Sequence, residues 1–153
     1  MALTVSHLVG GYSQIPVLKD ISFEVRPGEL VGLIGLNGAG KSTTINHIIG
    51  LLTPMKGKIT LNDVTLATDP QAYKAQIAYI PETPILYEEL TLKEHLEMTM
   101  LAYGLDQKAA WERANDLLKI FRLDNKLDWF PANFSKGMKQ KVMIVCAFIT
   151  NAK

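Results

Sequence analysis

Residues 29–43 read Glu29-Leu-Val-Gly-Leu-Ile-Gly-Leu-Asn-Gly-Ala-Gly-Lys-Ser-Thr43, an apolar run that leads into a glycine-rich loop. The apolar run predicts a buried strand over residues 29–34, and the loop matches the pattern G-x-x-x-x-G-K-[ST] in full. Glycines adopt backbone conformations that other residues avoid, so successive N–H groups can converge on an anion at the N-terminus of the next helix. The stretch therefore predicts a phosphate-binding loop. The alternative is an unliganded glycine-rich turn between a strand and a helix.

Two side chains of this loop have specific predicted roles. Lys41 is expected to reach the β- and γ-phosphates of a nucleotide, and the Ser42 hydroxyl is expected to bind Mg²⁺. Such a loop occurs in kinases, GTPases and molecular motors alike, so other residues must decide the class of protein.

Composition narrows the class of protein. The chain has 153 residues, 48% of them hydrophobic and 20% charged, which is typical of one soluble globular domain. Its 16 Lys and Arg balance 15 Asp and Glu, so no strong net field attracts nucleic acid or an anionic membrane. The longest apolar stretch, residues 142–149, is shorter than the ~20 residues that span a bilayer, and the N-terminus does not resemble a signal peptide. We expect a cytoplasmic protein in which Cys146, within that stretch, is a core residue.

Hydrophobic periodicity gives the order of elements. Strands are predicted at residues 3–9, 17–25, 29–34, 56–62 and 76–80. Helices are predicted at residues 41–52, at 69–74, from a capping box at Thr91 to Glu94 onward, at 107–121, and from a Ser135 cap through 149. We expect an α/β core over residues 1–86, a helical subdomain over 87–140 and the end of the last helix over 141–153.

Three further segments carry a resemblance to a known family. Phe134-Ser-Lys-Gly-Met138 resembles the Leu-Ser-Gly-Gly-Gln signature of ABC-type ATPases, with Ser135 and Gly137 matching. Residues 79–91 occupy the place of the family's Q-loop, and Tyr12 stands where the family has its adenine-stacking aromatic. With the loop at 35–43, these segments lie in the family's order. The chain, from Met1 to Lys153, looks like the ATP-binding subunit of an ABC transporter.

The resemblance implies a fold, a ligand and a set of site residues. The fold would be an α/β P-loop NTPase core with an antiparallel β element and a helical subdomain, and the ligands would be ATP and Mg²⁺. The residues expected at the nucleotide are Tyr12, Gly35, Asn37, Gly38, Ala39, Gly40, Lys41, Ser42, Thr43, Ser135 and Gly137. Those expected at Mg²⁺ are Ser42 and Glu82. Each of three residues also has a simpler interpretation. Tyr12 could pack a turn, Ser135 could only cap its helix, and Glu82 could be an exposed acid after a proline.

The chain departs from the family pattern in its signature and its Q-loop. Lys136 replaces the first signature glycine, and we expect its long side chain to lie in solvent. Met138 replaces the signature glutamine. At the Q-loop, Glu82 stands in place of glutamine, and its carboxylate remains a hard oxygen ligand for Mg²⁺. We therefore expect nucleotide binding to depend more strongly on Mg²⁺.

The family's hydrolytic residues are missing. No apolar strand ending in Asp-Glu occurs in the sequence, and the later switch histidine is absent as well. We expect a chain truncated before that strand, with no catalytic residue of its own, that binds nucleotide without hydrolysing it. Apolar surface around Val31, Leu33 and Ile34 is then expected to be uncovered, which favours self-association.

The resemblance also implies partners. In the family, two ATP-binding subunits pack head to tail over two ATP molecules and drive a membrane-spanning subunit, so the protein would lie on the inner face of the membrane through that partner. Nucleic acid is not an expected partner. The region around Glu82 and the altered signature resemble bacterial export-type subunits, including the Ecs type. The alternatives are a non-transport ABC ATPase of mechanical or translation-linked function and a nucleotide-binding module only.

Overall fold

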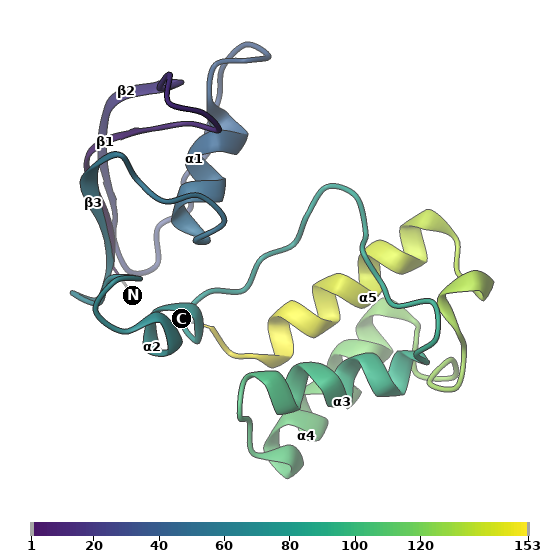
Figure 1. Cartoon of the computed structure of the whole chain (residues 1–153). Helices are drawn as coiled ribbons and strands as arrows, with labels where there is room; N and C mark the ends of the chain where they lie inside the picture. Colours follow the sequence, from purple (N-terminus) through teal and green to yellow (C-terminus); the bar gives the residue numbers. More distant parts are fainter. Residues whose placement is uncertain (1, 153) are drawn as a thin grey trace. The chain divides into compact units, whose positions relative to one another are not determined.

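The computed structural model describes residues 2–152, which form two compact units (Figure 1). The first, here called the sheet unit, ends at Ile77. The second, the helical unit, covers Ala78–Ala152. Each unit has a hydrophobic core of its own.

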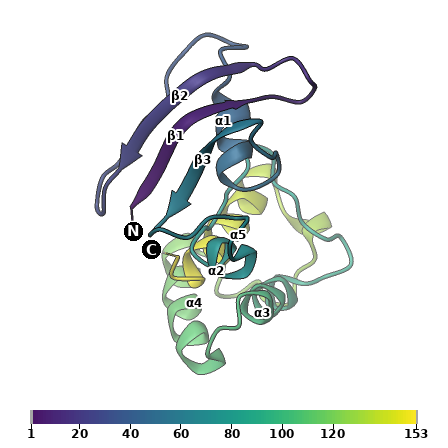
Figure 2. The ribbon, with the colours of Figure 1, turned by 60° about the vertical axis from the view of Figure 1, so that its left-hand side comes forward.

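The sheet unit is built on a three-stranded antiparallel sheet with the strand order β2-β1-β3 (Figure 2). The strands are β1 (Leu3–Gly10), β2 (Leu18–Val25) and β3 (Lys56–Leu61), which confirms three of the predicted strands. In the register, Val5 of the central strand lies opposite Phe23 on one side and Ile59 on the other. Helices α1 (Lys41–Ile48) and α2 (Pro70–Lys74) complete the unit.

The core of the sheet unit is formed by side chains from the sheet and from the two helices. Its fully buried side chains include Leu8, Leu61 and Tyr73. The Tyr73 hydroxyl donates a hydrogen bond to the carbonyl oxygen of Ile48 at 2.8 Å. This bond ties α2 to the end of α1, and burial raises the pKa of Tyr73 to about 12.

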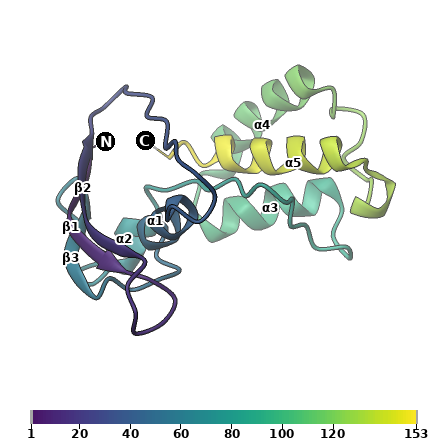
Figure 3. The ribbon, with the colours of Figure 1, turned by 90° about the horizontal axis from the view of Figure 1, so that it is seen from above.

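The helical unit contains α3 (Leu92–Ala102), α4 (Gln107–Phe121), a short 3₁₀ turn at Pro131–Asn133 and α5 (Lys136–Ile149) (Figure 3). Each α-helix begins at a side chain that accepts a backbone N–H: Thr91, Asp106 and Ser135. The predicted capping box is confirmed, since the Glu94 side chain also accepts the Thr91 N–H. The helices predicted in this region are therefore formed where the sequence placed them.

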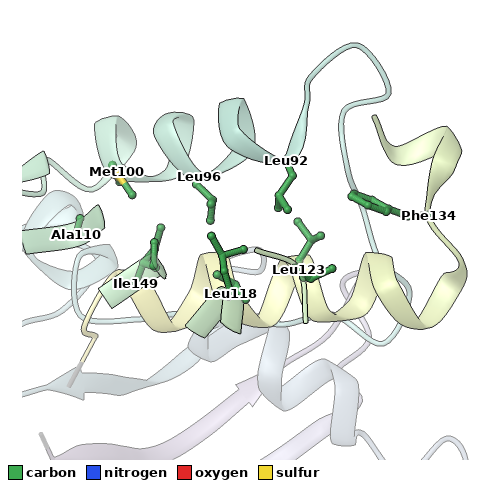
Figure 4. Close-up of a cluster of buried hydrophobic side chains, with 11 residues drawn as sticks. Leu92, Leu96, Met100, Ala110, Leu118, Leu123, Phe134 and Ile149 are labelled. Carbon is green, nitrogen blue, oxygen red and sulfur yellow. The ribbon is translucent and has the colours of Figure 1, made fainter. Parts of the chain in front are cut away.

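The core of the helical unit lies between the apolar faces of its helices (Figure 4). Leu92, Leu96 and Met100 recur at spacing of four on α3 and are fully buried. They face Leu118 of α4 and Ile149 of α5. Within residues 2–152, the search for a helix with the length and apolarity of a membrane span finds none.

Two predicted strands, at residues 29–34 and 76–80, are wrong, because neither segment has strand structure. Leu30 and Ile34 are 101% and 95% exposed, and the predicted burial of the first segment is therefore wrong as well. A parallel strand forms only when a neighbour takes up its hydrogen bonds and helices cover its faces. Within residues 2–152 no strand pairs with either segment.

Two boundaries also differ from the sequence-based ones. Helix α1 ends at Ile48 instead of residue 52, because Gly50 takes a positive φ of 79° and the N–H groups of Leu51 and Leu52 turn back to the carbonyl of Asn46. The compact units divide after Ile77, whereas the expected boundary lay at residue 86. Residues 78–86 belong with the helical unit, where Leu86 packs against the core.

Candidate functional site

The glycine-rich loop at residues 35–40 enters α1 through two left-handed residues. Gly38 has a φ of 82° and Gly40 a φ of 89°, values that side chains other than glycine rarely tolerate. A Cβ on Gly40 would also lie 2.6 Å from a terminal methyl carbon of the buried Leu18 side chain of β2, which would have to shift to make room for it. The loop is thereby fixed against the sheet at one end and open at Gly38, where an added Cβ would meet nothing within 4 Å.

Lys41 folds its side chain back over the loop. Its Nζ donates hydrogen bonds to the carbonyl oxygens of Gly35 at 2.6 Å and Leu36 at 2.8 Å. These two contacts hold the ammonium group over the exposed loop, where a phosphate can exchange for the carbonyl oxygens. The role of Lys41 at the phosphates of a nucleotide stays a prediction.

The N-terminus of α1 differs from those of the longer helices in its capping. It begins at Gly40 without a side-chain cap, whereas α3, α4 and α5 each have one. The first N–H groups of an α-helix have no partner within the helix, and the helix dipole favours negative charge there. Ser42 is exposed at this end, while Thr43 is 5% exposed, with a carbonyl oxygen 2.7 Å from Nδ1 of His47.

Tyr12 is held at its hydroxyl end by the helix that follows the loop. Asn46 of α1 donates a hydrogen bond from Nδ2 to the Tyr12 hydroxyl at 2.9 Å, and Tyr12 as a whole is 64% exposed. The ring is thus anchored at its tip and accessible elsewhere. Sequence reasoning missed Asn46, because no motif marks a residue that acts only by contact with another segment.

His47 fixes the same helix to the end of β1. Its Nδ1 bonds the Thr43 carbonyl, so Nδ1 carries the proton and Nε2 is the acceptor. Nε2 is buried without a hydrogen-bond partner and abuts Gly10, where any Cβ would overlap the imidazole ring. The expectation that His47 is a packing residue agrees with this environment.

The remaining predicted site residues lie in the helical unit. Ser135 is the N-cap of α5, and its Oγ accepts the Met138 N–H at 3.3 Å. The hydroxyl proton remains available for donation, since the cap uses only an acceptor position. Gly137 and Lys136 are exposed beside it, as is Glu82 in the irregular segment before α3.

The structure groups the candidate residues into two sets. Tyr12 and the loop at 35–43 form one set in the sheet unit, held together by α1. Glu82, Ser135 and Gly137 form the other, in the helical unit. In the part of the chain that the structure describes, no cluster of three or more His, Cys, Asp or Glu side chains could hold a metal ion by itself. The Ser42 hydroxyl and the Glu82 carboxylate are hard oxygen donors of the kind that Mg²⁺ prefers when phosphates supply its other ligands.

Comparison with known proteins adds family information to this geometry. The model of the ABC transporter family matches residues 18–153. The ABC-type transporter ATP-binding protein EcsA of Bacillus subtilis is 63% identical over 147 residues, which are 96% of this chain and 60% of EcsA. The SkfA peptide export ATP-binding protein SkfE of the same organism is 35% identical over 137 residues, or 88% of this chain and 56% of SkfE.

A solved structure described as the ATP-binding subunit of an ABC transporter is similar in fold. It matches with a TM-score of 0.94 and 58% identity, over 98% of this chain and 62% of its own. This confirms the predicted fold class, an ABC-type α/β P-loop NTPase. The chain spans 60% of the length of EcsA and 56% of SkfE. The family match over most of the chain, together with relatives this similar, shows that the chain belongs to the ABC transporter family.

Proposed function

We propose that this chain binds MgATP through the loop at residues 35–43. The observation that carries the proposal is the N-terminus of α1, which has no side-chain cap and lies beside the Lys41 ammonium group. Lys41 and the loop N–H groups would hold the phosphates, Tyr12 would stack on adenine, and Ser42 would bind Mg²⁺. Magnesium would supply charge neutralisation at the phosphates.

In the complete subunit, bound ATP would be hydrolysed within a head-to-tail dimer. Ser135 and Gly137 of one subunit would then meet the γ-phosphate held by the other subunit, where a hydroxyl and the N-terminus of α5 suit an anion. A membrane-spanning partner would couple hydrolysis to transport and would hold the protein at the inner face of the membrane. Export is the proposed direction, since SkfE is named as a peptide export protein.

Titration with a fluorescent ATP analogue tests nucleotide binding by the chain. Lys41→Ala is expected to weaken binding about 10- to 100-fold, the equivalent of the 1.5–3 kcal/mol of a hydrogen bond to a charged group. Lys19→Ala, which removes the same charge from an exposed position of β2, serves as the control and should bind normally. Equal affinities of the wild type and Lys41→Ala would refute the proposed site.

Two further measurements address Mg²⁺ and hydrolysis. Glu82 should make ATP affinity depend on Mg²⁺, and Glu82→Gln should reduce that dependence. Comparable affinity with and without Mg²⁺ in both proteins would contradict the role of Glu82 at the metal.

The 153-residue chain should release no phosphate from ATP, because its sequence has no apolar strand ending in Asp-Glu. Steady Mg²⁺-dependent phosphate release by this chain would overturn that part of the proposal.

A further inference from the structure

The loop that carries Tyr12 is short and closed at its base. Residues 11–17 connect β1 to β2, and the N–H of Val17 donates a hydrogen bond to the carbonyl oxygen of Gly10 at 2.9 Å. A Cβ on Gly11 would lie 3.0 Å from the backbone nitrogen of Val17, so the two ends of the loop approach each other closely. Both ends of the loop around Tyr12 are therefore fixed to the sheet.

The Tyr12 loop meets the glycine-rich loop where it joins β2. A Cβ on Gly40, directly before α1, would lie 2.6 Å from a methyl carbon of Leu18 and 3.6 Å from one of Val17. All of these residues belong to the sheet unit, so their relative placement is set within one compact body. A nucleotide whose phosphates bind the glycine-rich loop would therefore have the Tyr12 loop beside it.

Asn46 holds the far end of the Tyr12 side chain. It is half-buried on α1, five residues after Lys41 and thus about 7–8 Å further along the helix axis. Its Nδ2 donates a hydrogen bond to the Tyr12 hydroxyl at 2.9 Å. This bond ties the tip of the tyrosine to the same helix whose N-terminus adjoins the glycine-rich loop.

A hydrogen bond at the hydroxyl restrains one of the two side-chain torsions of Tyr12. The torsion χ1 decides where the ring lies, and the hydroxyl moves with it, so a contact at that oxygen selects one χ1 rotamer. The hydroxyl lies on the axis of χ2, so the ring can still turn about that axis and present its face to a base. The Asn46 bond therefore fixes the place of the ring and leaves its plane adjustable.

We propose that Asn46 is a positioning residue that keeps the Tyr12 ring in place for stacking on the base of the nucleotide. The inference rests on the proposed function of Tyr12 and adds a residue of α1 to it. Without the bond, a side chain that is 64% exposed would occupy several χ1 rotamers, and ordering it would reduce the affinity for the nucleotide. Asn46 acts through the Tyr12 hydroxyl and contacts neither phosphate nor base in this scheme.

Calorimetric titration of the chain with ATP and with inorganic tripolyphosphate tests the inference, because the ratio of the two affinities isolates the contribution of the nucleoside. Asn46→Leu has a similar volume but no donor, and it should lower that ratio about 2- to 3-fold, the smaller end of the effect of one hydrogen bond. Its affinity for tripolyphosphate should be unchanged. Asn115→Leu makes the same chemical change at an exposed position of α4, and as the control it should keep both affinities.

A double-mutant cycle and a rescue variant separate positioning from a general effect on α1. Tyr12→Phe removes the same bond without altering α1 and should lower the ratio by the same factor, and adding Asn46→Leu to it should have no further effect. Asn46→Asp can accept a hydrogen bond from the Tyr12 hydroxyl, so it should restore the wild-type ratio even where its charge weakens the binding of both ligands.

The possible failures of the inference and of the proposed function give different results. An unchanged ratio in Asn46→Leu, or an equal fall with and without the Tyr12 hydroxyl, would overturn the role of Asn46 alone. A wild type that binds ATP no more tightly than tripolyphosphate, with Tyr12→Ala unchanged in both affinities, would overturn the role of Tyr12 as well. A wild type that binds neither ligand would overturn the proposed function.

Discussion

At the scale of single residues, Tyr12 offers the most specific test of ligand identity. Asn46 holds its hydroxyl at 2.9 Å and leaves the residue 64% exposed. Tyr12→Ala should weaken ATP binding by about 1–3 kcal/mol, the range for a base stacked on an aromatic ring. Binding of inorganic tripolyphosphate, which has no base, should be unchanged, and titration calorimetry with both ligands measures the difference.

Tyr12→Phe is the matched control for this prediction. It keeps the ring and loses only the hydrogen bond to Asn46, so ATP affinity should fall much less than in Tyr12→Ala. If Tyr12→Ala weakened tripolyphosphate and ATP equally, the ring would be acting on the loop and not on the base.

Cys146 gives a prediction about pH. Burial raises the pKa of its thiol to about 11, while a hydrogen bond with Thr99 opposes the shift. A thiol reacts as the thiolate, so iodoacetamide should modify the folded chain slowly at pH 8 and rapidly after unfolding in urea. Because the folded state favours the neutral thiol, Cys146 contributes to the free energy of unfolding. This contribution is full below the unfolded pKa, near 8.5, and is lost as the pH rises toward 11.

A folded-state reaction rate that rises around pH 8, as for a free thiol, would contradict this assignment. Cys146→Ala should incorporate no label under either condition, because the chain contains a single cysteine. Cys146 is half-buried and packs against the core of the helical unit, so the expectation from sequence that it is a core residue is confirmed only in part.

At the scale of elements, the capping box of α3 should contribute measurably to stability. Thr91 Oγ1 accepts the Glu94 N–H at 3.3 Å, and the Glu94 carboxylate accepts the Thr91 N–H at 2.7 Å. Thr91→Ala should lower the free energy of unfolding by about 1 kcal/mol, as for other threonine caps, measured by urea denaturation. Thr83→Ala, at an exposed position of the same unit, should have little effect.

The same motif depends on pH through Glu94. Its hydrogen bond with the Thr91 backbone is the main cause of a lowered Glu94 pKa. A carboxyl group whose folded pKa is lowered stabilises the folded state above its unfolded pKa, and that contribution is lost as the pH falls through the lowered value. A Glu94→Gln variant should therefore differ most from the wild type near neutral pH and least in acid.

Elements fixed by local signals were predictable, and those that depend on a partner were not. Thr91, Asp106 and Ser135 cap their helices by contacts within four residues, and the caps at Thr91 and Ser135 were predicted from the sequence. Residues 29–34 have the apolar composition of a strand, but a strand needs hydrogen bonds from another segment. The apolar composition of residues 29–34 was therefore not enough to predict their structure.

The candidate site divides in the same way. The pattern of the loop at 35–43 predicts phosphate binding, because its fixed glycine, lysine and hydroxyl positions suit the local backbone or phosphate chemistry. Asn46 could not be predicted, since its side chain contacts Tyr12, which lies 34 residues away in the sequence. Contacts of this range are set by tertiary packing, which one sequence does not display.

At the scale of the whole molecule, the exposed apolar segment at residues 30–36 should govern association of the chain. Leu30, Ile34 and Leu36 are 101%, 95% and 85% exposed, and contiguous apolar surface of this kind favours contact between molecules. Sedimentation velocity should show concentration-dependent association of the 153-residue chain. The double variant Leu30→Lys/Ile34→Lys should remain monomeric, with an unfolding free energy close to that of the wild type because neither side chain is buried.

The matched control places the same two charges elsewhere on the molecule. Leu101 and Ile120 are 78% and 71% exposed in the helical unit, so Leu101→Lys/Ile120→Lys changes net charge and apolar area in a similar way. If association depends on residues 30–36, this control should associate like the wild type, whereas general charge repulsion would dissociate both variants. Monomeric behaviour of the wild type across the accessible concentration range would show that the exposed segment does not drive association.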